Sequence, residues 1–372
     1  MKVTFPHLGS LSIVLTGLLQ DFGLEVIPPP PITKKTIDLG VLHAPEFACL
    51  PLKINLGNFI EALELGADTI VMGGGTGPCR FGYYAQVQRE ILQDLGFNFQ
   101  MIVLEPPQGQ VSKLVDKLKI LCGNKRPGEI LQAAITAWYK IKALDKLQGE
   151  VLKCRAFELE KGATSKAYEA GLSFLQAART PAQVKTGLKK GLELLAGVKQ
   201  KINKDALRVG LIGEVYMLLE PFANLQVEKL LGEMGVVVER SVYLSSWITE
   251  HLILSSLRLP GGLATKKAAA KYIKQFVGGH GRESVGDMVR FARRGFDGVI
   301  HILPFTCTPE IVAQSILPIV SRQEGIPYLS VSLDEQSGEA GFITRLEAFL
   351  DLLKQRRHKT QNQAFKLATA RR

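Results

Sequence analysis

The feature that most constrains the fold is a regular alternation of short apolar runs with helix-like stretches, which occurs twice. The first set of apolar runs covers 2–6, 24–30, 68–74 and 99–107. The second set covers 207–215, 236–244, 296–305 and 326–334. Helical periodicity between these runs leaves room for crossover connections, which parallel strands require. The pattern predicts two parallel α/β sheets with helices on their faces.

The segment between the two sets differs in composition. Residues 110–204 are rich in Leu, Ala, Lys and Glu and contain few strand-like runs. We therefore expect an α/β fold with two Rossmann-like parallel-sheet lobes and a helical insertion between them. The expected parts are an N-terminal α/β lobe (1–108), the helical insertion (109–205), a C-terminal α/β lobe (206–353) and a basic tail (354–372).

Length and composition are consistent with a cytoplasmic protein of two domains. The chain has 372 residues, of which 46% are hydrophobic and 22% charged. The apolar stretch 8–19 contains Ser10, Ser12 and Thr16, so it is expected to be a core helix and not a signal segment. No apolar run reaches the roughly 18–20 residues that span a bilayer, and we expect no membrane partner.

The positive charge is concentrated at the C-terminus. The tail from Lys354 to Arg372 accounts for seven of the net positive charge of +11. No nucleic-acid-binding motif accompanies it. We therefore expect the tail to be a solvated end and the protein to have no nucleic-acid partner.

Three of the five cysteines lie where ligands gather in parallel α/β sheets, at the carboxyl ends of strands. Cys79 follows the run 68–74, and Cys307 follows the run 296–305. Cys49 precedes a helix that is expected to begin near Asn55. An odd, sparse set of cysteines argues against a disulfide framework.

The same three cysteines share a local context. Each has a proline within two residues. Two closely precede a helix, whose N-terminus should lower the pKa of the thiol. Thiolates in stiff loops of two lobes would converge on one metal centre between them. Three cysteines suit a 4Fe-4S cluster with one iron open to another ligand. A zinc site and buried structural cysteines remain alternatives.

Other residues receive weaker assignments. Cys122 and Cys154 lie in the helical insertion and are expected to be ordinary buried thiols. His301, within a strand, is expected to be a core histidine. His280 lies in a glycine-rich loop, which is either a plain turn or a neighbour of the cluster or substrate. Arg80 adjoins Cys79 and would either offset the charge of a thiolate-bound cluster or pair with a nearby acidic side chain.

The glycine-rich stretch "GGGTG" (73–77) admits a second interpretation. Its backbone N–H groups precede a helix, as they do in phosphate sites. However, the chain contains no G-x-x-x-x-G-K-[ST] motif, and no complete G-x-G-x-x-G motif in a strand–helix context. The glycines would instead let the backbone pass close to a bulky cofactor.

Several motifs together resemble the 2-hydroxyglutaryl-CoA dehydratase D-component family, and its stand-alone branch often labelled CoA-protein activase in particular. The three cysteine motifs are "PEFACLPLKINLGN" (45–58), "GGTGPCRFGYYAQVQ" (74–88) and "GFDGVIHILPFTCTPEIVAQSILP" (295–318). Further matching segments are "GEVYMLLEPFANLQVE" (213–228), "GGHGRESVGD" (278–287) and "DEQSGEAGFITRLEAFLDLL" (334–353). The likeness covers nearly the whole chain, and 110–204 is its least diagnostic part.

The resemblance implies an iron–sulfur protein of the 2-hydroxyacyl-CoA dehydratase type. It implies a 4Fe-4S cluster bound by Cys49, Cys79 and Cys307 between two Rossmann-like lobes. It also implies that a separate ATP-dependent activator of the actin/Hsp70 fold supplies low-potential electrons. An acyl-CoA or another small molecule would be the substrate, and a homo- or heterodimer the assembly. The alternative is a non-catalytic scaffold or binding protein for a CoA derivative or a partner redox protein.

Overall fold

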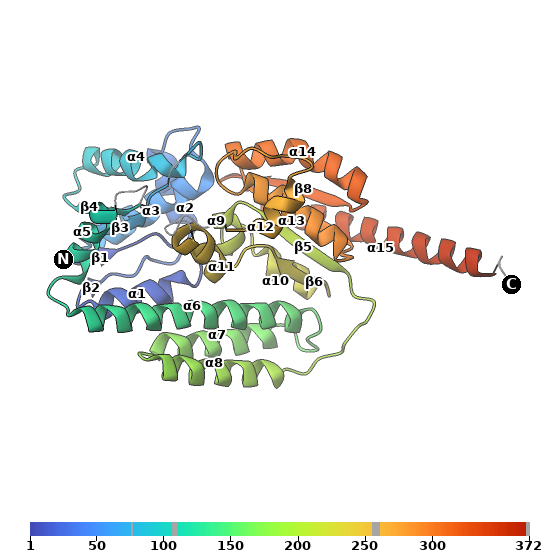
Figure 1. Ribbon diagram of the computed structural model, residues 1–372, viewed down its shortest axis with the longest axis horizontal. Coiled ribbons are helices and arrows are strands. Elements are labelled where there is room, and N and C mark those ends of the chain that lie inside the picture. The colour runs from blue at the N-terminus through green and yellow to red at the C-terminus, as the bar shows by residue number, and fades with distance from the viewer. Residues whose placement is uncertain (76, 106–110, 255–260, 370–372) are drawn as a thin grey trace.

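The computed structural model describes residues 1–75, 77–105, 111–254 and 261–369. Two four-stranded sheets lie side by side, with strand orders β2-β1-β3-β4 and β6-β5-β7-β8 (Figure 1). The first sheet contains β1 (Lys2–Thr4), β2 (Glu25–Val26), β3 (Thr69–Gly73) and β4 (Gln100–Leu104). The second contains β5 (Arg208–Gly213), β6 (Val237–Arg240), β7 (Gly298–Pro304) and β8 (Tyr328–Leu333). Every strand pair is parallel, which confirms the predicted α/β fold with two Rossmann-like lobes.

Helices cover both faces of the first sheet. These are α1 (Leu11–Asp21), α2 (Lys34–His43), α3 (Leu50–Glu64), α4 (Phe81–Asp94) and α5 (Val111–Cys122). Successive residues of β3 point to opposite faces, as strand geometry requires. Ile70 and Met72 join the core formed with α3 and α4, whereas Val71 joins the core that includes Leu19 of α1 and Leu121 of α5.

Three local expectations for this lobe need correction. The run 24–30 forms only the two-residue strand β2, because the prolines from position 28 onward have no N–H for a sheet ladder. Helix α2 was not predicted. Helix α3 begins at Leu50, five residues before the expected start near Asn55, since Pro51 is tolerated in the first turn of a helix.

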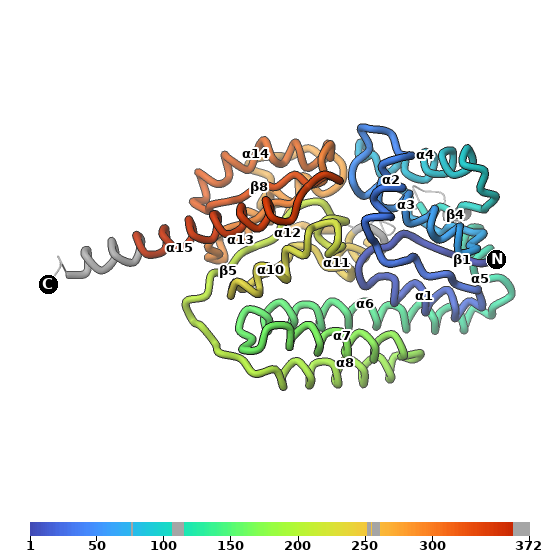
Figure 2. Tube along the Cα trace, turned by 180° about the vertical axis from the view of Figure 1, so that it is seen from behind, coloured from blue at the N-terminus to red at the C-terminus, as the bar shows by residue number. Residues whose placement is uncertain are grey.

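The helical insertion is built around one long helix that runs beneath both lobes. Helix α6 (Pro127–Arg155) has 29 residues and packs against α7 (Ala163–Ala177) and α8 (Pro181–Ala196). Its other side contacts α1 of the first lobe and two helices of the second, α10 (Val227–Glu233) and α11 (Leu244–Ile248). Figure 2 shows α6 along the lower edge of both lobes, with α7 and α8 below it.

Helices also cover both faces of the second sheet. Strand β7 lies inside the sheet, and all seven of its residues are buried. One face packs against α12 (Leu263–Ala269), α13 (Gly281–Arg293) and α14 (Thr308–Glu324). The other packs against α9 (Val215–Leu219), α10 and α15 (Glu339–Thr369). A short π-helical turn (Thr249–Leu254) follows α11.

The last helix continues beyond the expected start of the basic tail. Helix α15 runs without interruption through position 354 to Thr369. Within it, Arg357 pairs with Asp297 and donates to the backbone carbonyl of Asp205, so this part of the tail is tied to the lobe. Across the described ranges, no helix combines the length and apolarity needed to cross a membrane.

Direct contacts join the two lobes. Leu50 and Ile54 of α3 belong to the apolar core of the second lobe. Next to them, Lys53 Nζ lies 2.6 Å from Glu335 Oε1, and both side chains are largely buried. The start of α3, which carries Cys49, is therefore held against the second lobe.

Candidate metal centre

Cys49 lies immediately before the first turn of α3. Its backbone is extended, with φ −70° and ψ 153°, and Pro51 occupies the first turn. The side chain is buried, and its Sγ lies 2.7 Å from Tyr84 Oη of α4. A buried thiol thus stands at the positive end of a helix.

Cys307 has the same local arrangement in the second lobe. It directly precedes α14, with Pro309 in the first turn, and its side chain is buried. The preceding Thr306 has φ +68°, a left-handed conformation that is uncommon outside glycine. The sharp turn lets β7 pass directly into α14 and places Cys307 at the carboxyl end of the sheet.

Cys79 lies in the turn between β3 and α4. Its carbonyl accepts a hydrogen bond from the N–H of Gly82 at 3.2 Å, and Arg80 is the residue that precedes the helix. The Cys79 side chain is half-buried, in contrast to the other two.

One backbone carbonyl connects the three cysteine loops. The carbonyl of Phe47, two residues before Cys49, accepts a hydrogen bond from Thr306 Oγ1 at 3.1 Å. It also accepts one from the guanidinium of Arg80, whose carbon lies 5.5 Å from the centre of the Phe47 ring. Since Thr306 adjoins Cys307 and Arg80 adjoins Cys79, the structure brings together all three loops that the sequence singled out.

A fourth loop packs against this assembly. A Cβ atom at Gly279 would lie 3.1 Å from Pro309 Cγ and 3.9 Å from the Sγ of Cys79. Gly279 has φ +44°, and the neighbouring Gly278 has φ +86°. Glycine therefore lets this loop lie against both the Cys79 turn and the start of α14. The buried His280 follows directly and precedes α13.

Side chains of the protein itself pack against the glycines before Cys79. A Cβ at Gly75 would lie 2.7 Å from the ring of Phe81, and one at Gly77 would lie 3.2 Å from the ring of Phe276. A Cβ at Gly74 would clash with Glu105 at 2.5 Å. The protein's own side chains thus fill the room beside these glycines. Thr76 lies outside the described residues.

Burial dominates the electrostatics of the three thiols. It raises the pKa of Cys49, Cys79 and Cys307 above the ordinary value for a thiol. The backbone N–H groups at the start of each helix act in the opposite direction and are outweighed. The expected lowering of these pKa values is therefore wrong, because desolvation disfavours a thiolate more strongly than the helix ends favour it.

Two carboxyl groups add to this effect. Glu214, at the carboxyl end of β5, raises the pKa of all three thiols, and Glu310 of α14 raises those of Cys79 and Cys307. Burial in turn raises the pKa of Glu214 to about 7, although the N–H of Met217 donates to it at 3.0 Å. The thiols and these carboxyl groups form one interacting set.

Glu310 belongs to a buried polar chain. Its Oε2 lies 2.9 Å from His301 Nε2, and His301 Nδ1 lies 2.9 Å from Ser330 Oγ. Neither Glu310 nor His301 has exposed surface. This confirms His301 as a hydrogen-bonded core histidine. The second carboxyl oxygen of Glu310, Oε1, is buried without a hydrogen-bond partner.

The donor chemistry fits a metal cluster, although the side chains do not stand as ligands. Within the described ranges, no three His, Cys, Asp or Glu side chains are arranged to hold a metal ion. The Cys49 thiol points to Tyr84 instead. Three thiols from three linked loops, an unsatisfied carboxyl oxygen and a glycine loop beside Cys79 nevertheless form the kind of surroundings that an iron–sulfur cluster uses.

The remaining cysteines lie elsewhere and are buried, as expected. Cys122 ends α5. Cys154 lies in α6, where its Sγ is 3.4 Å from the hydroxyl of Thr164 and 3.7 Å from the carbonyl oxygen of Leu195. Both are core thiols of the helical part of the chain.

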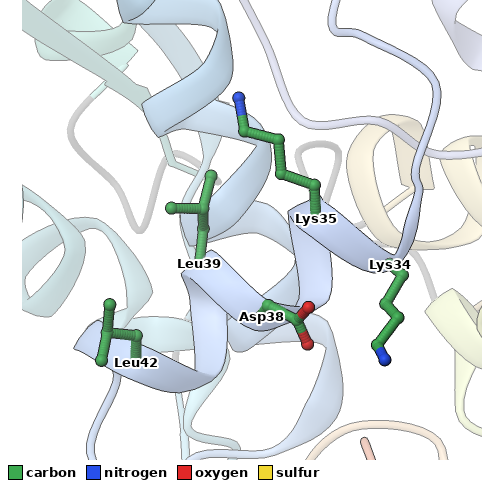
Figure 3. A pocket seen from close by; sticks show the side chains of 5 residues that line it. All are labelled: Lys34, Lys35, Asp38, Leu39 and Leu42. Carbon is green, nitrogen blue, oxygen red and sulfur yellow. The ribbon is translucent and has the colours of Figure 1, made fainter.

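A shallow surface pocket on α2 does not extend the candidate centre. All of its lining residues come from that one helix: Lys34, Lys35, Asp38, Leu39 and Leu42 (Figure 3). None is a cysteine or a contact of the cysteine loops described above.

Sequence reasoning missed three participants in the centre: Tyr84, Glu214 and the carbonyl of Phe47. Tyr84 lies within the motif that contains Cys79, but its burial and its contact with Cys49, which distinguish it from the exposed Tyr83, appear only in the structure. Glu214 directly follows β5, a position that the carboxyl-end rule could have identified. The sequence matches no protein-family model, and it has no match among curated proteins.

Proposed function

We propose that this chain is an iron–sulfur protein of the 2-hydroxyacyl-CoA dehydratase type. Cys49, Cys79 and Cys307 hold one 4Fe-4S cluster, and the fourth iron is left for another ligand or for substrate. The observation that carries the proposal is the convergence of the three cysteine loops on the Phe47 carbonyl. The motif resemblance supports the same ligand set.

The chain's own residues would prepare the site for such a cluster. When bound, the cluster supplies one-electron chemistry at low potential. Burial and Glu214 keep the free thiols protonated, so loading releases protons. The helix N–H groups that face the sulfurs and the Arg80 guanidinium favour negative charge there.

Exposed aromatic side chains support a docking site for an electron donor. Phe47, Tyr83, Phe276 and Phe305 lie on or beside the cysteine loops and are 57–70% exposed. Aromatic side chains are enriched where proteins bind one another. We propose that an ATP-dependent activator of the actin/Hsp70 fold docks here. An acyl-CoA or another small molecule would be the substrate, and the cytoplasm the compartment.

Iron and sulfide content after anaerobic purification tests the proposal. We expect about four irons per chain in the wild type. Cys49→Ser, Cys79→Ser and Cys307→Ser should each lose most of the iron. The matched controls Cys122→Ser and Cys154→Ser should retain it, because those thiols lie in helices away from the three loops.

The results also bear on the second candidate function, a non-catalytic scaffold for a CoA derivative or a redox partner, in its cluster-free form. The present bond between Cys49 and Tyr84 is what favours this alternative. A chain that stays iron-free after reconstitution, while its circular dichroism shows an intact fold, would refute the cluster and leave the scaffold as the remaining function. Iron loss in either control variant would refute the ligand set.

A further inference from the structure

A second site lies where three parts of the chain meet. A cavity of about 420 Å³ is lined by the loop after β1 and the start of α1, by helices α6 and α7, and by the segment from α9 to β6. Its polar lining residues include His7, Gln148, Arg155, Tyr168, Glu220 and Arg240. We call it the junction cavity. None of its lining residues belongs to a cysteine loop.

Most polar side chains named in this lining already have hydrogen-bond partners within the protein. The buried Arg240 donates to Gln148 Oε1 at 2.7 Å and to Glu228 Oε1 at 3.2 Å. Gln148 Nε2 donates to Tyr168 Oη at 3.1 Å and to Ser10 Oγ at 2.9 Å. This network links the three parts and fixes the shape of the cavity.

The carboxylates that line the cavity also have partners within the protein. The buried Glu220 accepts from the N–H of Gly9 at 2.6 Å and from the N–H of Phe222 at 3.1 Å, and its Oε2 lies 2.9 Å from His7 Nδ1. Glu228 pairs with Arg240. Both carboxylates are therefore engaged within the wall, Glu220 by hydrogen bonds and Glu228 by the Arg240 guanidinium.

Arg155 differs from its neighbours. Its side chain is 8% exposed, and its Nε has no hydrogen-bond partner. Its Nη2 donates to Ser165 Oγ at 3.3 Å. The nearby Glu158, whose pKa Arg155 helps to lower, accepts instead from the N–H groups of Gly162 and Thr164. A buried guanidinium with an unused donor is costly unless something binds it.

Packing holds Arg155 in place. Its aliphatic stem crosses α10 at Gly232, where a Cβ atom would lie 2.8 Å from Arg155 Cδ. The guanidinium is thus fixed at the cavity wall, and its side chain cannot be moved easily to find another partner. Fixed cationic donors are well suited to carboxylate or phosphate groups.

The cavity also has an apolar part, beside further polar lining residues: Ser12, Asn224, Gln226 and Lys229. Ile13, Val151, Leu152, Leu172 and Leu219 contribute to its lining. The volume lies within the range of small-molecule sites, which combine apolar walls with a few fixed polar groups. We propose that the junction cavity binds a small organic anion, whose carboxylate or phosphate pairs with Arg155 and whose apolar part contacts these side chains. Such a ligand would contact all three parts of the chain at once.

Ligand-observed NMR and calorimetry on the full-length chain can test this with four probes. Hexanoate and phenyl phosphate carry both an anionic group and an apolar part, and they distinguish a carboxylate from a phosphate ligand. Hexanol lacks the charge, and inorganic phosphate lacks the apolar part. We expect saturable binding of hexanoate or phenyl phosphate that exceeds the binding of hexanol and inorganic phosphate at least tenfold.

Two variants locate the binding. Arg155→Met should weaken it at least tenfold, whereas Arg126→Met, at the exposed start of the same helix, should not change it. Leu172→Trp retains Arg155 but fills the cavity with a larger side chain, so it should abolish binding. If Arg155→Met does not fold, this second variant still tests whether the anion binds in the cavity.

Three results would overturn the proposal: no saturable binding of either anion, equal binding of hexanol, or unchanged binding in the folded variants. The proposal does not depend on the cluster, because none of these probes or variants involves the cysteines. Its failure is therefore distinguishable from failure of the iron assay.

Discussion

Opposing influences on single side chains determine the protonation state of the candidate centre. The three thiols stand at helix N-termini, which favour thiolates, but burial raises their pKa values. The same two influences act on Glu214: the hydrogen bond from the N–H of Met217 lowers its pKa, but burial outweighs this and raises the pKa to about 7. At the scale of residues, desolvation is the stronger influence.

The shifted pKa of Glu214 predicts a pH-dependent stability of the iron-free chain. An unfolded glutamate ionises near its ordinary pKa of 4.5, whereas the folded protein holds the proton up to about pH 7. The folded state therefore binds more protons between these values, and stability falls as pH rises through this window. Glu214→Gln should remove this loss, so that the variant gains roughly 3 kcal/mol on the wild type between pH 4.5 and pH 8.

Urea unfolding at a series of pH values measures this difference. Glu193→Gln, an exposed position on α8, provides the matched control and should follow the wild type throughout. Parallel stability curves for wild type and Glu214→Gln would show that Glu214 ionises normally.

Among the elements, α2 and α3 are packed very closely. A Cβ at Gly57 of α3 would lie 1.9 Å from the carbonyl oxygen of Thr36 in α2. A Cβ at Gly40 of α2 would lie 1.9 Å from the carbonyl oxygen of Lys53 in α3. This reciprocal contact sets the position of α3, and so of the Cys49 loop at its start.

The contact predicts a large effect of one methyl group. Gly57→Ala must push the two helices apart, and we expect a loss of about 2 kcal/mol or more in unfolding free energy. Gly128→Ala in α6 is the control, because no atom lies within 4 Å of its added Cβ, and it should be neutral or slightly stabilising. Equal unfolding midpoints in urea for the two variants would contradict the close packing.

Across the whole molecule, the lobes are joined through the start of α3 and along α6. Lys53 and Glu335 form an ion pair between the lobes, with side chains 4% and 18% exposed. Removing one partner of a buried pair leaves the other charge without compensation.

Lys53→Met should therefore destabilise the protein by about 3 kcal/mol, and adding Glu335→Gln should recover part of that loss. Lys35→Met is the control: its partner Glu64 lies 3.5 Å away in an exposed pair, which is worth less than about 1 kcal/mol. Thermal unfolding of the four proteins measures these differences. A Lys53→Met variant as stable as the control would show that the lobes do not depend on this pair.

Much of the architecture follows from the sequence alone. Alternating strand and helix patterns predicted both parallel sheets, because a backbone segment's periodicity depends on its own residues and on which face it buries. The carboxyl ends of strands and the prolines after Cys49 and Cys307 also indicated where the thiols lie. The start of α3 was misplaced, since a helix boundary depends on capping and packing as well as on pattern.

Tertiary structure decided what depends on contacts between distant segments. Three features involve residues that are far apart in the chain. They are the meeting of three loops at the Phe47 carbonyl, the hydrogen bond between Cys49 and Tyr84, and the cavity beside Arg155. The direction of the thiol pKa shifts could likewise not be predicted from the sequence. A sequence shows that a cysteine precedes a helix, but only the packed chain shows how much water its thiol has lost.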